Sequence, residues 1–183
     1  MFRTARSARA ADRVRAFDTA VDAWFDHLRG PLADGLFFRL SSAADHGLVW
    51  VAIGALRAAA TGEPATAVRL AASMSVESML TNGPIKLCFR RVRPEDITPD
   101  VPLPYGMHRP ITSSFPSGHA ASAFTAATLL AGGPATPLWY ALAALIASSR
   151  VYVRMHHASD VIAGAALGVA IGAVARRLLP LGG

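Results

Sequence analysis

The sequence contains little cysteine and little charge. Its single cysteine, Cys88, excludes an intramolecular disulfide and a metal site of the CxxC type. Charged residues make up 16% of the chain, whereas soluble globular chains carry roughly a quarter. Hydrophobic residues make up 52% of the 183 positions. This composition is typical of a small protein that crosses a membrane several times.

Lysine is almost absent, although the chain is basic. The net charge is +6, and the 18 basic residues include one lysine, Lys86. A basic chain can bind nucleic acid, but here alanine- and leucine-rich segments separate the arginines, and aromatic and basic residues do not alternate. We therefore expect the arginines to flank a bilayer that contains anionic lipid, and we expect no nucleic-acid partner.

The first 40 residues lack a continuous apolar run. Residues 1–15 carry five arginines, and Asp18, Asp22 and Asp26 interrupt the segment that follows. We therefore expect no cleaved signal peptide. Apolar residues over 17–28 recur at helical spacing, on a different face from the three aspartates. This pattern predicts an amphipathic helix that lies at the membrane surface.

Longer apolar stretches begin at residue 42. The predicted fold class is all-α, a polytopic membrane helical bundle of about five to six transmembrane helices with an N-terminal amphipathic helix. We divide the chain into a basic N-terminus with the interfacial helix, 1–40, and a transmembrane domain, 41–183. The five clearest predicted spans cover residues 42–60, 65–87, 118–131, 138–153 and 158–179.

Small residues dominate all five predicted spans. Such residues let helices approach closely in lipid, and Gly164 and Gly168 have the GxxxG spacing of close helix contacts. The connection 90–115 is the one sizeable loop, and it is charged and rich in proline. Loops of this length in compact domains are usually functional or disordered.

Three short polar motifs lie at the ends of these spans. Counting crossings places the end of the second span, the start of the third, the end of the fourth and the start of the fifth at one membrane face. The polar residues that this count brings together are Lys86, Arg93, Ser117, Gly118, His119, Arg150, His156 and Asp160.

Five of these residues suit the binding of a phosphate group. A phosphate monoester carries nearly two negative charges, which Lys86, Arg93 and Arg150 can offset. The planar guanidinium of arginine donates two parallel hydrogen bonds to phosphate oxygens. Ser117 is a candidate N-cap residue, and Gly118 lets the backbone approach an oxygen closely, so the start of the third span forms an anion site.

The other three residues suit a two-step hydrolysis. His156 and Asp160 are four residues apart and share one face of a helix. A carboxylate that holds one ring nitrogen leaves the other nitrogen free to attack, so His156 is the expected nucleophile and forms a phosphohistidine. His119, from another helix, can protonate the leaving alkoxide and later activate water. This set needs no metal and no cofactor.

The motifs resemble the three signatures of the type 2 phosphatidic acid phosphatase (PAP2) superfamily. In chain order they are K-x6-R-P at residues 86–94, P-S-G-H at 116–119 and S-R-x5-H-x3-D at 149–160. The resemblance implies a helical membrane enzyme, independent of metal, that removes phosphate from a lipid. It also implies the same catalytic and phosphate-binding roles for the eight residues named above.

The resemblance covers about residues 77–168 of the chain, with one departure from the family pattern. This departure is His157-Ala158, where the family often has an aromatic residue and a proline. Within the family, the chain is similar to phosphatases of polyprenyl-linked intermediates, including decaprenylphosphoryl phosphoribose 5-phosphate. Undecaprenyl pyrophosphate and phosphatidylglycerophosphate fit the same cations and remain alternative substrates.

Two alternatives belong to other functional classes. Vanadium haloperoxidases share the three motifs, but they are larger soluble helical proteins, and five apolar spans argue against that class. A non-catalytic membrane scaffold or transporter is the second alternative. The complete set of nucleophile, acid and cations argues against it.

The distribution of arginine also predicts sidedness. With five spans, the arginine-rich N-terminus and the polar motifs share one side, whereas the other side has only Arg69, Arg176 and Arg177 nearby. Because cytoplasmic flanks are rich in Lys and Arg, we expect a multi-pass protein of the cell membrane with its active site on the cytoplasmic face.

Three further charged residues have expected places. Glu77 lies inside the second span, where an ionisable group is costly, and we expect it to pair with Arg57, Arg69 or a catalytic cation. Arg90 and Arg91 flank the same span and are expected to be lipid-facing charge.

Overall fold

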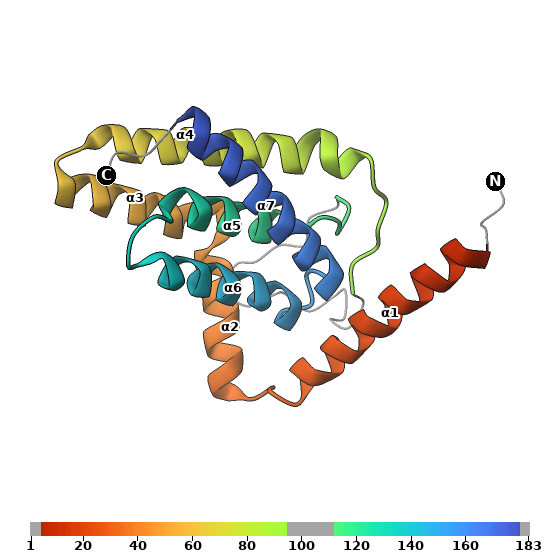
Figure 1. Cartoon of the computed structure of the whole chain (residues 1–183). Helices are drawn as coiled ribbons and strands as arrows, with labels where there is room; N and C mark the ends of the chain where they lie inside the picture. Colours follow the sequence, from red (N-terminus) through yellow and green to blue (C-terminus); the bar gives the residue numbers. More distant parts are fainter. Residues whose placement is uncertain (1–4, 95–111, 180–183) are drawn as a thin grey trace.

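The computed structural model describes residues 5–94 and 112–179, and within these ranges every regular element is a helix. The predicted all-α class is therefore confirmed for the described residues. Most of the loop 90–115 lies outside them. The elements, shown in Figure 1, are α1 (Ala5–Asp26), α2 (Pro31–Ala43), the 3-10 turn η1 (Asp45–Gly47), α3 (Leu48–Thr61), α4 (Pro64–Leu80), the π turn η2 (Thr81–Ile85), α5 (Gly118–Leu130), α6 (Thr136–Tyr152) and α7 (Ala158–Leu178).

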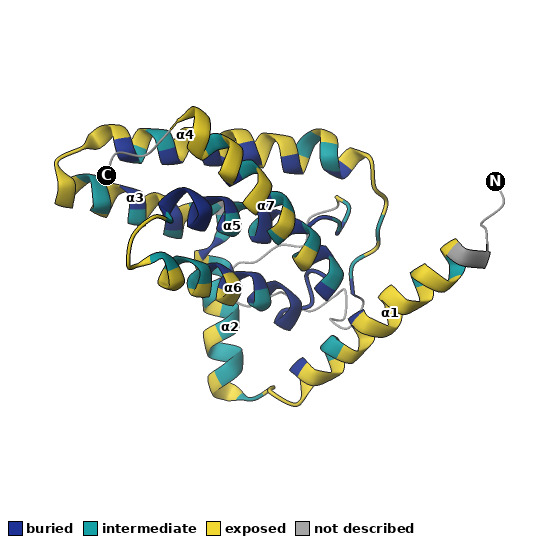
Figure 2. Cartoon of the chain, viewed as in Figure 1, coloured by how far each residue is buried: buried dark blue, intermediate teal, exposed yellow. Residues whose placement is uncertain are grey.

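Helix α5 forms the centre of the bundle. Helices α4, α6 and α7 pack around it, and most of its 13 residues are buried (Figure 2). Its sequence, GHAASAFTAATLL, consists largely of small residues, so neighbouring helices can approach its backbone on several sides. Neighbouring helices consequently fix the position of α5 in the bundle.

Glycines of α7 make the closest of these approaches. A Cβ atom built on Gly168 would lie 2.2 Å from the carbonyl oxygen of Ala121, and one on Gly164 would lie 2.4 Å from that of Ser117. Any side chain at either position would push α7 away from α5. The GxxxG spacing in the sequence therefore marks a real helix contact.

Two predicted spans are interrupted near the polar end of the bundle. The span 42–60 was predicted as one helix, but α2 ends at Ala43 and α3 begins at Leu48, with η1 between them. Gly47 adopts a left-handed conformation with φ 70°, which glycine accommodates without a Cβ clash and which ends the helical path. The prediction of one continuous helix over residues 42–60 was therefore wrong.

The second interruption lies in the predicted span 65–87. Helix α4 ends at Leu80 and the π turn η2 follows, with non-helical φ/ψ at Gly83 and a proline at Pro84. Proline has no N–H to donate, so it weakens a regular helix. The kink means that Lys86 does not continue the line of α4.

The N-terminal helices pack against the polar end of the bundle. Helix α1 is longer than the predicted 17–28, and α2 runs across the direction of α3 and α6 (Figure 1). Phe25 of α1 is buried against the ring of Tyr152, with 6.0 Å between centroids, whereas Trp24 is 58% exposed. Some apolar residues of α1 therefore pack against the bundle, and others face the surroundings of the protein.

One described helix, Ala158–Leu178, is long and apolar enough to cross a membrane by length and composition. Leu48–Thr61 is a shorter apolar helix.

Candidate active site

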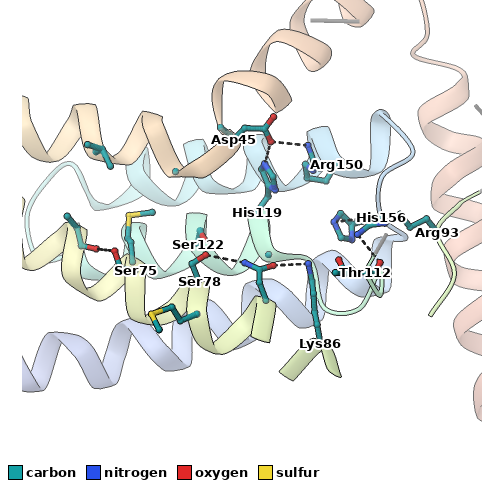
Figure 3. Close-up of a pocket in the computed structure, with 18 residues that line it drawn as sticks. Asp45, Ser75, Ser78, Lys86, Arg93, Thr112, His119, Ser122, Arg150 and His156 are labelled. Carbon is teal, nitrogen blue, oxygen red and sulfur yellow. Dashed lines mark hydrogen bonds and ion pairs between the residues drawn. The ribbon is translucent and has the colours of Figure 1, made fainter. Parts of the chain in front are cut away.

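The polar motifs meet in a cavity of about 580 Å³ at one end of the bundle. The cavity is bordered by η1 and by the ends of α4, α5 and α6 (Figure 3). Ser117 and Asp160 are fully buried and lie behind its wall. The predicted residues that line it are Lys86, Arg93, Gly118, His119, Arg150 and His156.

Three cations surround the cavity. Lys86 is buried, and its Nζ donates to Asn82 Oδ1 at 2.8 Å. Arg93 Nη1 donates to the carbonyl oxygen of Met155 at 2.6 Å. Burial lowers the pKa of Arg93, but a guanidinium stays protonated near neutral pH. Arg150 is 4% exposed.

The guanidinium of Arg150 still has donor capacity. Its Nη1 donates to Ser41 Oγ, whereas its buried Nε has no hydrogen-bond partner. A buried charged donor without a partner is costly, and a bound anion would remove that cost. Among the described residues that line the cavity, Asp45 is the one carboxylate, so the cavity favours negatively charged ligands.

The start of α5 borders the cavity where the anion site is predicted. Ser117 is its N-cap residue, and its Oγ accepts from the backbone N–H of Ala120 at 3.4 Å. A Cβ atom on Gly118 would lie 2.9 Å from Asn82 Oδ1. Any other residue at this position would therefore displace the amide that holds Lys86.

His156 has one ring nitrogen held and the other directed to the cations. Its Nδ1 donates to the carbonyl oxygen of Ser114 at 2.7 Å, and Asp160 Oδ2 lies 3.8 Å from the same nitrogen. Nε2 lies 3.3 Å from Arg93 Nη1. The main acceptor is therefore Ser114, which the sequence did not indicate, while Asp160 contributes charge at longer range. Burial lowers the pKa of His156 to about 3, so the ring is neutral, and its Nε2 lone pair faces the cavity, where it accepts a long hydrogen bond from Arg93 Nη1.

Asp160 is held from two sides. Its Oδ2 accepts from the backbone N–H of His157 at 3.0 Å, as part of a capping box that starts α7. The departure from the family pattern at His157-Ala158 thus leaves this helix start intact. Oδ1 accepts from Arg91 Nη1 at 2.6 Å. The expectation that Arg91 is lipid-facing charge was wrong, because a carboxylate 69 residues away binds it.

His119 has a partner that the sequence analysis missed. Its Nε2 lies 2.7 Å from Asp45 Oδ1, which is 4.0 Å from Arg150 Nη1 (Figure 3). Asp45 comes at the start of the first predicted span, and the count of crossings places that point on the same face as the motifs. The sequence therefore contained a signal for this residue.

Glu77 is fully buried, but its neighbours are hydroxyl groups. It accepts from Thr81 Oγ1 at 2.8 Å and from Ser122 Oγ at 2.5 Å. No salt bridge joins this described residue to Arg57, Arg69 or a catalytic cation, and the hydroxyls satisfy both of its oxygens.

The sequence model of the PAP2 superfamily matches residues 66–181, which include every residue predicted for the site. The chain belongs to the PAP2 superfamily. Relatives in this family include decaprenylphosphoryl-5-phosphoribose phosphatase of Mycobacterium tuberculosis, 37% identical over 90 residues. That alignment covers 49% of this chain and 49% of the relative, so the chain spans about half of the relative's length.

Two longer similarities extend beyond the motifs. The protein of the same name from Mycolicibacterium smegmatis is 35% identical over 130 residues, covering 68% of this chain and 67% of that protein. The crystal structure of a PAP2-type phosphatidylglycerolphosphate phosphatase from Bacillus subtilis superimposes with a TM-score of 0.68. It is 24% identical and covers 91% of this chain and 86% of its own. This likeness establishes a shared fold.

Proposed function

We propose that this PAP2 protein is an integral-membrane lipid phosphatase that hydrolyses a lipid phosphate ester through a phosphohistidine at His156. The observation that carries the proposal is the position of His156 Nε2, beside Arg93 and in a cavity that Lys86 and Arg150 also line. Fixed cations around a nucleophile are what phosphoryl transfer needs, because the transition state carries charge on several oxygens.

The first step forms a bond between His156 Nε2 and phosphorus, while the bond between phosphorus and the lipid oxygen breaks. His119 donates a proton to the leaving alkoxide. In the second step His119 removes a proton from water, whose oxygen attacks phosphorus and releases inorganic phosphate and neutral His156. Asp45 pairs with His119 and opposes the repulsion that Arg150 exerts on a protonated ring.

We also propose that five helices, α3 to α7, cross the membrane. The outward faces of α3, α4, α6 and α7 carry large exposed apolar side chains, a feature that soluble monomers rarely show over wide areas. A helix of 13 residues such as α5 is about 20 Å long, less than the hydrocarbon thickness of about 30 Å. Because other helices enclose α5, its ends do not face lipid. Exposed apolar residues on α3, α4 and α7 include Leu56, Val68, Val76, Met79, Ile162, Val174 and Leu178.

The cavity has room for part of a lipid chain. Beyond the cations it continues between α3 and α4, where Val51, Ala71, Met74 and Met79 line it. We infer a polyprenyl-linked phosphate such as decaprenylphosphoryl phosphoribose 5-phosphate as the substrate, a choice that the names of the mycobacterial relatives support. Undecaprenyl pyrophosphate and phosphatidylglycerophosphate are the competing substrates.

Phosphate release from a panel of these three lipid phosphates, in detergent with EDTA, tests the class of reaction and the substrate together. We expect release to continue in EDTA, because three protein cations take the place of a metal, and to be fastest with the phosphoribose lipid. Loss of all release in EDTA, restored by a divalent cation, would contradict metal independence. Bromide oxidation in the presence of vanadate would instead support the haloperoxidase class.

We also propose that the cavity opens to the cytoplasm. Helix α1 packs at the catalytic end of the bundle, so its arginines Arg9, Arg13 and Arg15 lie on the same side as the cavity. Cys88 is exposed in the segment between Lys86 and Arg93. In intact cells, a membrane-impermeant maleimide should leave Cys88 unlabelled until the membrane is permeabilised.

A control variant places the only cysteine at the opposite end. In a Cys88→Ser background, Thr61→Cys lies at the exposed C-terminal end of α3, next to the turn that leads to α4. It should be labelled from outside without permeabilisation. The reverse pattern in the two proteins would place the cavity on the external face.

A further inference from the structure

Helix α1 inserts a carboxylate beside the catalytic helix α7. Asp18 is only 3% exposed, although it belongs to a largely polar helix. Its Oδ1 accepts from the backbone N–H of Ser159 at 2.8 Å, and its Oδ2 accepts from Ser159 Oγ at 2.9 Å. A side chain 141 residues away thus satisfies an orphan donor in the first turn of α7.

Arg91 connects this carboxylate to the catalytic one. Its Nη2 donates to Asp18 Oδ2 at 2.6 Å, and its Nη1 donates to Asp160 Oδ1 at 2.6 Å. The same Nη1 lies 2.7 Å from Ser159 Oγ. The guanidinium is therefore fixed between two carboxylates. Asp160 belongs to the first turn of α7, and Asp18 contacts that turn through Ser159.

The start of α7 determines the position of the nucleophile. His156 precedes the helix by two residues, and Asp160 lies 3.8 Å from its Nδ1. Without Asp18, Arg91 would lose one of its two carboxylate partners, and the first turn of α7 would lose a cap. A displacement of about 1 Å at a reacting group can cost about 100-fold in rate.

We propose that Asp18 is a positioning residue, which holds Arg91 and the first turn of α7 so that Asp160 and His156 keep their catalytic geometry. This inference rests on the proposed phosphatase function. It gives α1 an indirect part in turnover, through Arg91 and Asp160. Asp18 touches none of the three cations around the cavity, so its effect falls on the rate of phosphoryl transfer and leaves substrate binding nearly unchanged.

The test compares Asp18→Asn with two variants of the same helix in the full-length protein. We expect Asp18→Asn to lower kcat about 10- to 100-fold and to change KM less than about twofold. Phosphohistidine formation in a single turnover should slow by the same factor as kcat. Asp12→Asn, which removes an exposed pair with Arg15, should match the wild type.

The variant Asp26→Asn separates the positioning of Asp160 and His156 from the docking of α1 on the bundle. Asp26 binds Arg154 and also helps to hold α1, but it does not contact Arg91 or Ser159. Its kcat should stay within about threefold of the wild type, an effect of less than 1 kcal/mol. Equal losses in Asp26→Asn and Asp18→Asn would overturn the proposal, since docking alone would then explain both. A kcat of Asp18→Asn within twofold of the wild type, a range in which rates are effectively unchanged, would also overturn it.

Arg91→Lys tests the same connection from its centre, should Asp18→Asn fail to fold. Lysine keeps the charge but cannot bind two carboxylates with a planar fork. We expect a similar loss of kcat, and no further loss in the double variant with Asp18→Asn, because both changes break one bridge. Multiplicative losses would contradict the proposal. If the wild type releases phosphate and His156→Ala does not, the phosphatase function stands whatever these variants show.

Discussion

Replacing His156 with alanine is expected to lower kcat by about 100,000-fold or more, the size of effect that loss of a nucleophile has in enzymes with covalent intermediates. The buried ring is neutral and has one nitrogen fixed by Ser114, so its Nε2 is the one prepared for attack. Steady-state phosphate release from the preferred lipid measures the loss. His27→Asn, at an exposed position on the segment after α1, is the control and should retain full activity.

Acid-labile phosphate on the protein gives a second measurement of the same prediction. Wild-type protein quenched during turnover should carry phosphohistidine, and His156→Ala should carry none. With a substrate whose leaving group needs no proton, His119→Ala should still become phosphorylated but lose the phosphate slowly, because it lacks the base that activates water. Label on the His156→Ala protein would show that another residue is the nucleophile.

Replacing Arg150 with alanine is expected to lower kcat/KM by about 1,000- to 100,000-fold, the range seen when an arginine that stabilises transferring phosphate is removed. Its Nε is buried without a partner, and the residue as a whole is only 4% exposed. Charge in such a site stabilises an anion far more than at a surface. Arg150→Lys should be intermediate, because it keeps the charge and loses the planar fork.

Two controls separate phosphate binding from packing. Ser41→Ala removes the hydroxyl that Arg150 Nη1 contacts, and should cost about tenfold or less if the contact is structural. Arg57→Ala removes an arginine of α3 that does not line the cavity and should leave kcat/KM unchanged. Vanadate, a phosphate analogue, should inhibit Arg150→Ala far more weakly than the wild type. Equal inhibition by vanadate would mean that Arg150 does not bind the phosphate group.

The sequence predicted the later helices more accurately than the earlier ones. Helices α5 and α7 begin at residues 118 and 158, as the spans 118–131 and 158–179 predicted. Polar motifs mark both starts, because an N-cap residue and a capping box are local features. The break before α3 was not predicted, since hydropathy reports where apolar residues gather and not where the backbone turns.

The sequence by itself determined the cations and histidines that line the cavity and the end of the bundle at which they lie. Spacing along a helix is a local property, and the membrane face of each helix end follows from counting the crossings. Without coordinates, the sequence could therefore assign to one face the residues Lys86, Arg93, His119, Arg150 and His156. The tertiary structure alone decided which charges pair. Arg91 binds Asp160 and Asp18, and His119 binds Asp45, across separations of 69, 73 and 74 residues. Many arginines and aspartates could form such pairs, and only the packing of α1 against α7, and of η1 against α5, selects among them.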